Sequence, residues 1–275
     1  MKFLRRIVFL FREKGILYIV RIIIARIERF LVAKGILKKR IKKYSFFKSQ
    51  FTGKNGIEIG GLSPIFGATG YLPIYPLVNK LDGCNFSSTT LWEGNIQDGE
   101  SYNFFKKKYG TQYISEATDL HFIPDEKYDF VISSNCLEHI ANPLKALEDW
   151  KRVLKKDGLL LLLVPNKKYF FDHKRPIVTF SHLFEDYQKG VGENDLTHLD
   201  EILILHDLEM DKHSGTFEQF KTRSLKNFEN RTLHHHVFDG KVLEEIYNYL
   251  DFEILLTDEN KNHLILGRKK NSNGH

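Results

Sequence analysis

The sequence is poor in cysteine and lacks any long uninterrupted apolar run. Cys84 and Cys136 are the only cysteines in 275 residues. Two thiols are too few for a disulfide framework or a metal knuckle, so the composition fits a reducing compartment. Arginines break the apolar runs near the start before they reach the roughly 18 to 20 residues of a membrane-spanning helix, and no small-residue cleavage site follows. We therefore expect a cytoplasmic protein whose N-terminal segment is retained and does not span a membrane.

Several short motifs are also absent, and each absence argues against a class of site. The chain has no G-x-G-x-x-G turn and no Gly-Lys pair followed by Ser or Thr. It therefore does not look like a nicotinamide dehydrogenase, and it offers no obvious cradle for a pyrophosphate. His-Asp and His-His-His groupings could supply metal ligands, but no His-x-x-x-His helix pair and no thiolate pair fixes their geometry. We therefore expect no metal ion.

Charge is distributed unevenly along a chain whose formal net charge is +6. Residues 1–43 carry fourteen Lys and Arg against two Glu, a net charge of +12, which leaves −6 for the rest of the chain. A basic arm on an acidic body suggests that arm and body meet different partners. Because nucleic acid needs basic patches along the whole contact surface, the acidic body argues against nucleic-acid binding.

The basic arm has the pattern of an amphipathic helix. On a helical wheel, the large apolar residues of 16–33 fall on one arc, and the arginines fall outside it. Gly15 and Gly35 are the expected ends of this helix. We expect its apolar face to pack on the body or on the second subunit of a homodimer. Peripheral contact with the inner membrane is the alternative, with the basic side chains at the lipid headgroups.

Beyond the arm, short apolar segments alternate with amphipathic ones. Strands are expected at 56–59, 77–81, 113–115, 130–133, 159–164, 252–256 and 263–266. Asn142-Pro143 is typical of a helix start, and Asp239 is expected to cap a helix through Leu250. The uninterrupted apolar run at 159–164 is typical of a central parallel strand covered on both faces. The alternation predicts an α/β fold with a doubly wound, mostly parallel sheet.

Polar residues follow several of these strands, at the sheet edge where such folds bind ligands. Glu58 stands near the end of the first strand, and Gly60, Gly61 and Ser63 follow it. Glycines let the backbone approach a ligand closely, and an acidic strand end suits a ligand that carries positive charge. A simple turn is the alternative interpretation of this segment.

Later strand ends extend the same pattern. Asp82 lies 22 residues after Gly60, a spacing at which an acid can bind ribose hydroxyls, although it could equally be a turn residue before Gly83. Glu116 follows the third expected strand, and Asn135 follows the fourth. Each position is a weak signal alone, but their order and spacing together favour one ligand site along this edge.

Residues 54–170 resemble the class I S-adenosylmethionine-dependent methyltransferases. The resemblance rests on Gly-Ile-Glu-Ile-Gly-Gly at 56–61, on residues 116–125, and on Tyr-Asp-Phe-Val-Ile-Ser-Ser-Asn-Cys-Leu-Glu-His-Ile at 128–140 before the Asn142-Pro143 helix start. It implies a seven-stranded sheet, S-adenosylmethionine as methyl donor and S-adenosylhomocysteine as product. In one departure, Leu62 stands where the family often has a second spaced glycine.

The resemblance also implies a set of cofactor-binding residues. These are Glu58, Gly60, Gly61, Ser63, Asp82, Glu116, Ala117 and Asn135. By position, Glu58 would face the methionine amino group, directly or through water, and Asp82 would bind the ribose hydroxyls. Glu116 and Ala117 would lie beside the adenine, and Asn135 near the methionine end or the methyl acceptor.

The chain is expected to divide into an arm at 1–43, a methyltransferase domain at 44–270 and a disordered tail at 271–275. Between the fifth strand and the last helix, residues 167–236 form an insertion far longer than an ordinary connection. We expect this insertion to be partly helical and to cap the acceptor pocket at the carboxyl edge of the sheet.

Histidines are concentrated in this insertion, with eight of the twelve between residues 173 and 236. A hydroxyl acceptor needs a base to remove its proton, and an imidazole with a pKa near about 6.5 suits that role. His139, His173 and His236 are the candidate catalytic residues. The alternative is a set of surface or hydrogen-bonded histidines without a catalytic role.

A narrower resemblance bears on the acceptor. Residues 128–158, together with short motifs at 195–198, 206–207 and 234–239, resemble members from bacterial surface-polysaccharide gene clusters. The expected function is methyl transfer to a polar small-molecule or glycan-precursor acceptor, at oxygen. The alternatives are a methyltransferase that acts on a membrane lipid or lipid-linked intermediate, and a non-catalytic module that only binds the cofactor.

Overall fold

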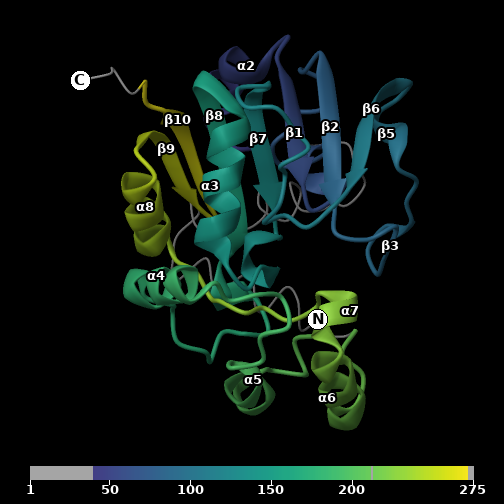
Figure 1. Ribbon diagram of the computed structural model, residues 1–275, viewed down its shortest axis with the longest axis vertical. Helices are drawn as coiled ribbons and strands as arrows, with labels where there is room; N and C mark the ends of the chain where they lie inside the picture. Colours follow the sequence, from purple (N-terminus) through teal and green to yellow (C-terminus); the bar gives the residue numbers. More distant parts are fainter. Residues whose placement is uncertain (1–39, 212, 272–275) are drawn as a thin grey trace, which may run out of the picture.

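The computed structural model describes residues 40–211 and 213–271, and within them an eight-stranded sheet lies between layers of helices (Figure 1). The strand order is β5-β6-β2-β1-β7-β8-β10-β9. The strands are β1 (Asn55–Ile59), β2 (Lys80–Asn85), β5 (Gly99–Phe105), β6 (Lys108–Ile114), β7 (Tyr128–Ser134), β8 (Leu154–Pro165), β9 (Phe252–Glu259) and β10 (Asn262–Lys269). Strands β6, β2, β1, β7 and β8 are parallel, whereas β5 and β10 run antiparallel to their neighbours. The predicted doubly wound, mostly parallel sheet is confirmed.

The eighth strand, β5, was not expected. It pairs with β6 through a tight hairpin in which Lys106 has a φ of +52°. Tyr102 and Phe104 are buried while Asn103 between them is exposed, which is the alternation of a strand with one covered face. A separate two-stranded sheet, β3 (Thr89–Thr90) and β4 (Gly94–Asn95), precedes it.

The central strand β8 explains why the sheet needs helices on both faces. Its residues Leu159, Leu161 and Leu163 pack into one buried cluster, and the alternate residues Leu160 and Leu162 pack into another on the opposite face. All five are nearly inaccessible to solvent. The uninterrupted apolar run was therefore correctly interpreted as a buried parallel strand.

Helices cover the two faces with their apolar sides. Helix α2 (Tyr44–Phe51) contributes to one cluster, and α3 (Pro143–Val153) and α8 (Gly240–Tyr249) contribute to the other. The predicted caps are confirmed, because the Asn142 side chain accepts a hydrogen bond from the Lys145 amide (3.1 Å) and Asp239 accepts one from the Val242 amide (2.9 Å).

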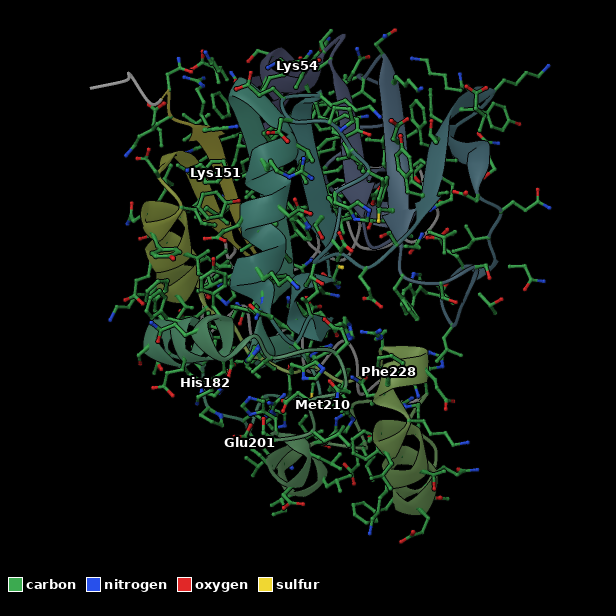
Figure 2. The ribbon with its side chains drawn as sticks, in the orientation of Figure 1. Lys54, Lys151, His182, Glu201, Met210 and Phe228 are labelled. Carbon is green, nitrogen blue, oxygen red and sulfur yellow. The ribbon has the colours of Figure 1, made fainter. Side chains whose placement is uncertain are left out.

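The insertion lies beyond the carboxyl end of the sheet. It contains the short 3₁₀ turn η3 (Lys167–Tyr169), α4 (Phe180–Lys189), α5 (Leu199–Leu205), α6 (Phe217–Leu225) and α7 (Asn227–Asn230). Figure 2 shows Lys54, just before β1, at the opposite end of the molecule from Glu201, Met210 and Phe228 of the insertion. The insertion therefore stands over the strand ends at which ligands bind in doubly wound sheets.

The basic arm expected at 1–43 lies outside the described residues except for its last four positions, and so does the expected tail beyond residue 271. In the described part of the chain, no helix is long and apolar enough to cross a membrane.

Candidate active site

The chain turns sharply after β1 at Gly60 and Gly61. Their φ angles are +98° and +94°, a region that side chains other than glycine rarely adopt. A Cβ on Gly60 would lie 2.6 Å from the Cβ of Cys136, so only glycine lets this turn pack against the segment after β7. A Cβ on Gly61 would collide with the Glu93 carboxylate. Gly60 borders a cavity, and Gly61 does not.

The cavity has a volume of about 400 Å³ and lies at the carboxyl ends of β1, β2, β6 and β7. The strand order reverses between β1 and β7, so the cavity occupies the position where ligands bind in doubly wound sheets. Its size falls within the range of about 300–1,000 Å³ typical of small-molecule sites. The expected site residues that border it are Gly60, Ser63, Glu116, Ala117, Asn135 and His139.

Glu58 lies behind the glycine turn and does not border the cavity. Its buried carboxyl group accepts hydrogen bonds from the hydroxyls of Tyr75 and Tyr102, both at 2.7 Å, and from the Ser63 amide at 3.0 Å. Burial raises the pKa of Glu58 to about 8. Glu58 thus fixes the turn from inside the core, and its expected role toward the methionine amino group, directly or through water, stays a prediction.

Asp82 was expected just after a strand, but the structure places it within one. It lies inside β2, where its carboxylate accepts hydrogen bonds from the Thr111 amide of β6 (2.9 Å) and the Tyr128 hydroxyl of β7 (2.8 Å). The strand was expected at 77–81, but it runs from Lys80 to Asn85. The strand end that borders the cavity is therefore Asn85, which the sequence interpretation missed.

Asn85 belongs to a polar group at the end of β2. Its Nδ2 donates to Oε1 of Glu93 (3.3 Å), which also accepts from the Leu62 amide (2.7 Å). Among the described residues, Oδ1 of Asn85 is buried without a hydrogen-bond partner. Because Asn85 borders the cavity, its side-chain amide is the candidate at this strand end to bind a ligand hydroxyl. The residue type at the strand end is the one sequence signal that could have found it.

Glu116 and Ala117 border the cavity beyond the end of β6, and Glu116 is held by a residue that the sequence interpretation missed. Nη2 of Arg231 lies 2.6 Å from Oε1 of Glu116, and its Nη1 lies 2.7 Å from Oε2 of Glu193. Arg231 is 6% exposed and also borders the cavity, as does Glu193. No local pattern marks Arg231, because its partners come from distant parts of the chain.

Asn135 follows β7 and borders the cavity in the expected place. It has a φ of +51°, and its amide donates to the Leu163 carbonyl of β8 (2.9 Å). Its Oδ1 accepts a hydrogen bond from Asn262 (2.9 Å). These contacts fix the segment that leads from β7 to the next 3₁₀ turn.

Of the three candidate bases, His139 alone borders the cavity. It lies in the 3₁₀ turn η2 (Leu137–His139), and its Nδ1 lies 3.0 Å from the Leu233 carbonyl. Burial lowers the pKa of His139 well below its usual value, so the imidazole is neutral and weakly basic. Burial also raises the pKa of its neighbour Glu138 to about 7.

His173 does not border the cavity. Its Nε2 lies 2.9 Å from Oδ2 of Asp207, and Lys174 lies 3.1 Å from the same oxygen. His173 follows β8 and η3 as expected, but its imidazole is paired within the insertion. The structure therefore does not place His173 at the cavity wall, and its expected role as a base stays a prediction.

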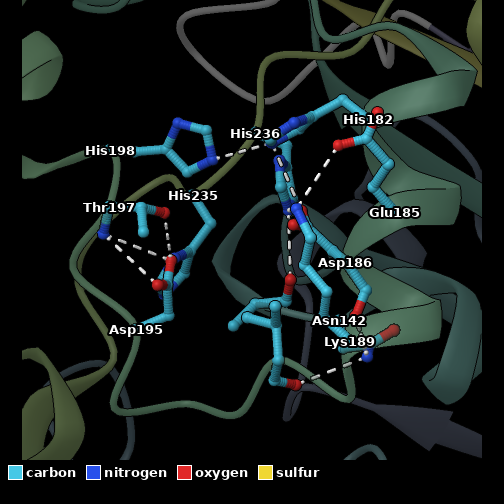
Figure 3. A network of polar contacts seen from close by, with 12 residues as sticks. Asn142, His182, Glu185, Asp186, Lys189, Asp195, Thr197, His198, His235 and His236 are labelled. Atoms are coloured by element: carbon cyan, nitrogen blue, oxygen red, sulfur yellow. Dashed lines mark hydrogen bonds and ion pairs between the residues drawn. The ribbon is translucent and has the colours of Figure 1, made fainter.

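His236 is buried and does not border the cavity, and its expected role as a base stays a prediction. Its Nε2 lies 3.2 Å from the Ala141 carbonyl, which can only accept, so this nitrogen donates. Around it are His182, Asp186 and His198, shown in Figure 3. The segment that precedes the last helix therefore packs against the body with this imidazole inside.

Comparison with known proteins gives one family match. Residues 79–162, which span β2 to β8, match the family described as a methyltransferase domain, Methyltransf_11. No curated protein matches the chain.

Several solved structures are similar to the chain at low sequence identity. A methyltransferase from Thermotoga maritima, described as a possible histamine N-methyltransferase, is 16% identical over 90% of this chain and 96% of its own, with a TM-score of 0.44. A methyltransferase from Methanosarcina mazei is 15% identical over 84% and 99%, with a TM-score of 0.45. One from Listeria monocytogenes is 16% identical over 81% and 93%, with a TM-score of 0.44.

The family match and the strand order agree. The matched residues form β2, β6, β7, α3 and most of β8, which supply much of the cavity wall. A sheet with this order, with its cavity at the reversal of strand order, is the class I methyltransferase fold. The match over residues 79–162 implies S-adenosylmethionine as the cofactor.

Proposed function

We propose that this chain transfers the methyl group of S-adenosylmethionine to an oxygen of a polar small-molecule or glycan-precursor acceptor. The observation that carries the proposal is the cavity at the ends of β1, β2, β6 and β7, which lies largely within the matched methyltransferase domain. S-adenosylmethionine supplies a methyl group on a positively charged sulfur, so the protein has mainly to align the donor and the acceptor.

The cavity residues fit the cofactor in their chemistry. Gly60 allows close backbone approach, and the unpartnered Oδ1 of Asn85 offers an acceptor for a ribose hydroxyl. Ala117 gives a small apolar wall beside Glu116. Asn85 thus takes the ribose-binding role that was assigned to Asp82.

The part of the cavity wall that the insertion supplies favours a polar acceptor. Glu193 and Arg231 reach it from the insertion, and His139 reaches it from η2. Charged and hydrogen-bonding side chains orient hydroxyl-rich ligands such as sugars, whereas a lipid chain would need an apolar wall. The proposed role of the insertion is therefore to cap the acceptor and to supply its polar contacts.

Two measurements test the proposal in sequence. Isothermal titration of the full chain should show S-adenosylhomocysteine binding, and the ligand should raise the melting temperature because it binds only the native state. Transfer of labelled methyl groups to a panel of nucleotide sugars and free sugars should then identify the acceptor. Absence of binding at millimolar ligand would remove the assignment, and binding without transfer to any acceptor would favour the non-catalytic module.

A further inference from the structure

Three side chains next to the cavity meet in a way that the proposed methyl transfer does not explain. Glu138 and His139 come from η2, and His234 comes from the segment after α7. One potential ligand atom from each lies within 4.8 Å of the others. We call Glu138, His139 and His234 the Glu-His-His cluster. His139 connects it to the cavity.

Both imidazoles of the cluster have a fixed tautomer. Nδ1 of His139 lies 3.0 Å from the Leu233 carbonyl, which can only accept, so Nδ1 carries the hydrogen. Nδ1 of His234 lies 2.8 Å from the Asp172 carboxylate and donates to it. Each Nε2 is therefore left with a free lone pair. Histidines that bind metal ions are typically oriented in this way, by a hydrogen bond from the other ring nitrogen to a carbonyl or carboxylate.

The third member of the cluster, Glu138, is a buried carboxyl group without a partner. It is 2% exposed, and within residues 40–211 and 213–271 neither of its side-chain oxygens has a hydrogen-bond partner. The Nε2 of His139 lies 4.0 Å from its Oε1, too far for a hydrogen bond. A buried carboxylate is costly unless it is paired or bound to a cation.

We propose that Glu138, His139 and His234 bind a divalent transition-metal ion of the zinc type. Two imidazole nitrogens and one carboxylate oxygen form a common catalytic ligand set for such ions. Bonds of about 2.0–2.2 Å place neighbouring ligand atoms roughly 3.4 Å apart, so binding would draw the three side chains together by about 1 Å. Three protein ligands leave at least one position for another molecule.

The position of the cluster suggests what occupies that open position. Because His139 borders the cavity, a metal ion held by its Nε2 could bind and polarise a hydroxyl oxygen of the acceptor. This role rests on the proposed function, whereas the metal site itself does not. It also explains why a weakly basic histidine stands at the cavity wall: the metal ion would lower the pKa of the bound hydroxyl, and its proton would leave to solvent water rather than to the imidazole.

A second group of possible ligands, His182, Asp186, His198 and His236, provides a matched control (Figure 3). Here Nε2 of His182 lies 3.0 Å from Nε2 of His198, and Nε2 of His236 donates to the Ala141 carbonyl. These Nε2 atoms thus have protein partners. Nδ1 of His236 is buried without a hydrogen-bond partner among the described residues, whereas in the Glu-His-His cluster the unpartnered group is a carboxyl group.

The test uses the full chain, stripped of metal with a chelator and then titrated with Zn²⁺ or Co²⁺. We expect one ion per chain and a visible Co²⁺ absorption band that Zn²⁺ abolishes. Glu138→Gln and His139→Gln should each weaken Zn²⁺ binding at least a hundredfold, and Asp172→Asn should weaken it about tenfold through His234. His182→Gln should leave the affinity within about threefold of the unchanged protein. Circular dichroism identifies any variant that fails to fold, and the two ligand variants act as checks on each other.

Two results would overturn the proposed metal site. No binding of Zn²⁺ or Co²⁺ at micromolar concentration would overturn the proposal. So would binding that survives Glu138→Gln and His139→Gln but is lost in His182→Gln, because the ion would then lie in the second group. Titration of the same metal-free protein with S-adenosylhomocysteine tests the proposed function separately from the metal site. Zn²⁺ binding without S-adenosylhomocysteine binding would preserve the metal site and reject the proposed function.

Discussion

Arg231 pairs with Glu116 across 115 positions of the sequence, with Nη2 of the arginine 2.6 Å from Oε1 of the glutamate. The same guanidinium pairs with Glu193 of the insertion and lies over the ring of Phe86 beyond β2. One buried side chain therefore ties the insertion to the segments that follow two strands of the sheet, at the wall of the cavity.

Removal of this guanidinium should destabilise the protein. In Arg231→Met, the largely buried Glu193 would lose its charged partner, and we expect the free energy of unfolding to fall by about 2 to 4 kcal/mol. Urea denaturation measures the change. The matched control is Lys241→Met, because Lys241 forms an exposed pair with Glu245 and should contribute less than about 0.5 kcal/mol. Equal losses in both variants would mean that the Arg231 pairs contribute no more than a surface contact.

Asn85 should matter for cofactor affinity. Asn85→Ala removes the unpartnered Oδ1 at the end of β2, and S-adenosylhomocysteine should bind about five- to thirtyfold more weakly, as expected for one lost hydrogen bond from a buried group. Isothermal titration gives the affinity. Asn103→Ala, on the exposed face of β5, is the control and should bind normally. An unchanged affinity in Asn85→Ala would place the ribose elsewhere.

Asp82, in contrast to Asn85, should matter for stability and not for cofactor affinity. Asp82→Ala breaks the bonds to Thr111 and Tyr128 that join β2 to β6 and β7, and we expect a loss of about 2 to 3 kcal/mol in stability. Cofactor affinity, measured well below the melting temperature, should change less than twofold because Asp82 does not border the cavity. A tenfold loss of affinity without a loss of stability would restore Asp82 as a ribose ligand.

Elements with strong local signals were predictable from the sequence. The apolar run of β8 and the Asn142-Pro143 start of α3 are set by side chains within a few residues of one another. The ends of β2 were not predictable in this way, because they depend on pairing with β1 and β6. Asp82-Gly83 has the composition of a turn, yet Gly83 lies in β2, where the ring of Tyr102 from β5 takes the place of a side chain.

The site was predictable only where it follows a strand end directly. Gly60, Ser63, Glu116 and Asn135 meet this condition, and all four border the cavity. Arg231 could not be found, because its position depends on how about seventy inserted residues fold back over the sheet. The histidines differ for the same reason. All three follow strands or precede the last helix near the site, but the packing of the insertion determines that His139 borders the cavity and that His173 and His236 do not.

The buried carboxyl group of Glu58 should give the protein a pH-dependent stability. Its pKa is raised from 4.5 in the exposed state to about 8 in the folded protein, mainly by burial. Between these values the folded state keeps a proton that the unfolded chain releases, so the free energy of unfolding should fall as the pH rises from about 4.5 to 8. The loss is at most about 5 kcal/mol over this interval.

Glu58→Gln tests this directly, because the amide keeps the shape of the protonated acid and does not titrate. We measure the free energy of unfolding by urea denaturation at several pH values. The difference in this free energy, variant minus unchanged protein, should increase steadily between pH 5 and pH 8. Glu100→Gln, an exposed carboxylate on β5, is the control and should leave the slope as it is. If the Glu58→Gln variant shows the same pH dependence as the unchanged protein, then Glu58 is ionised in the fold, and its hydrogen bonds from Tyr75 and Tyr102 outweigh its burial.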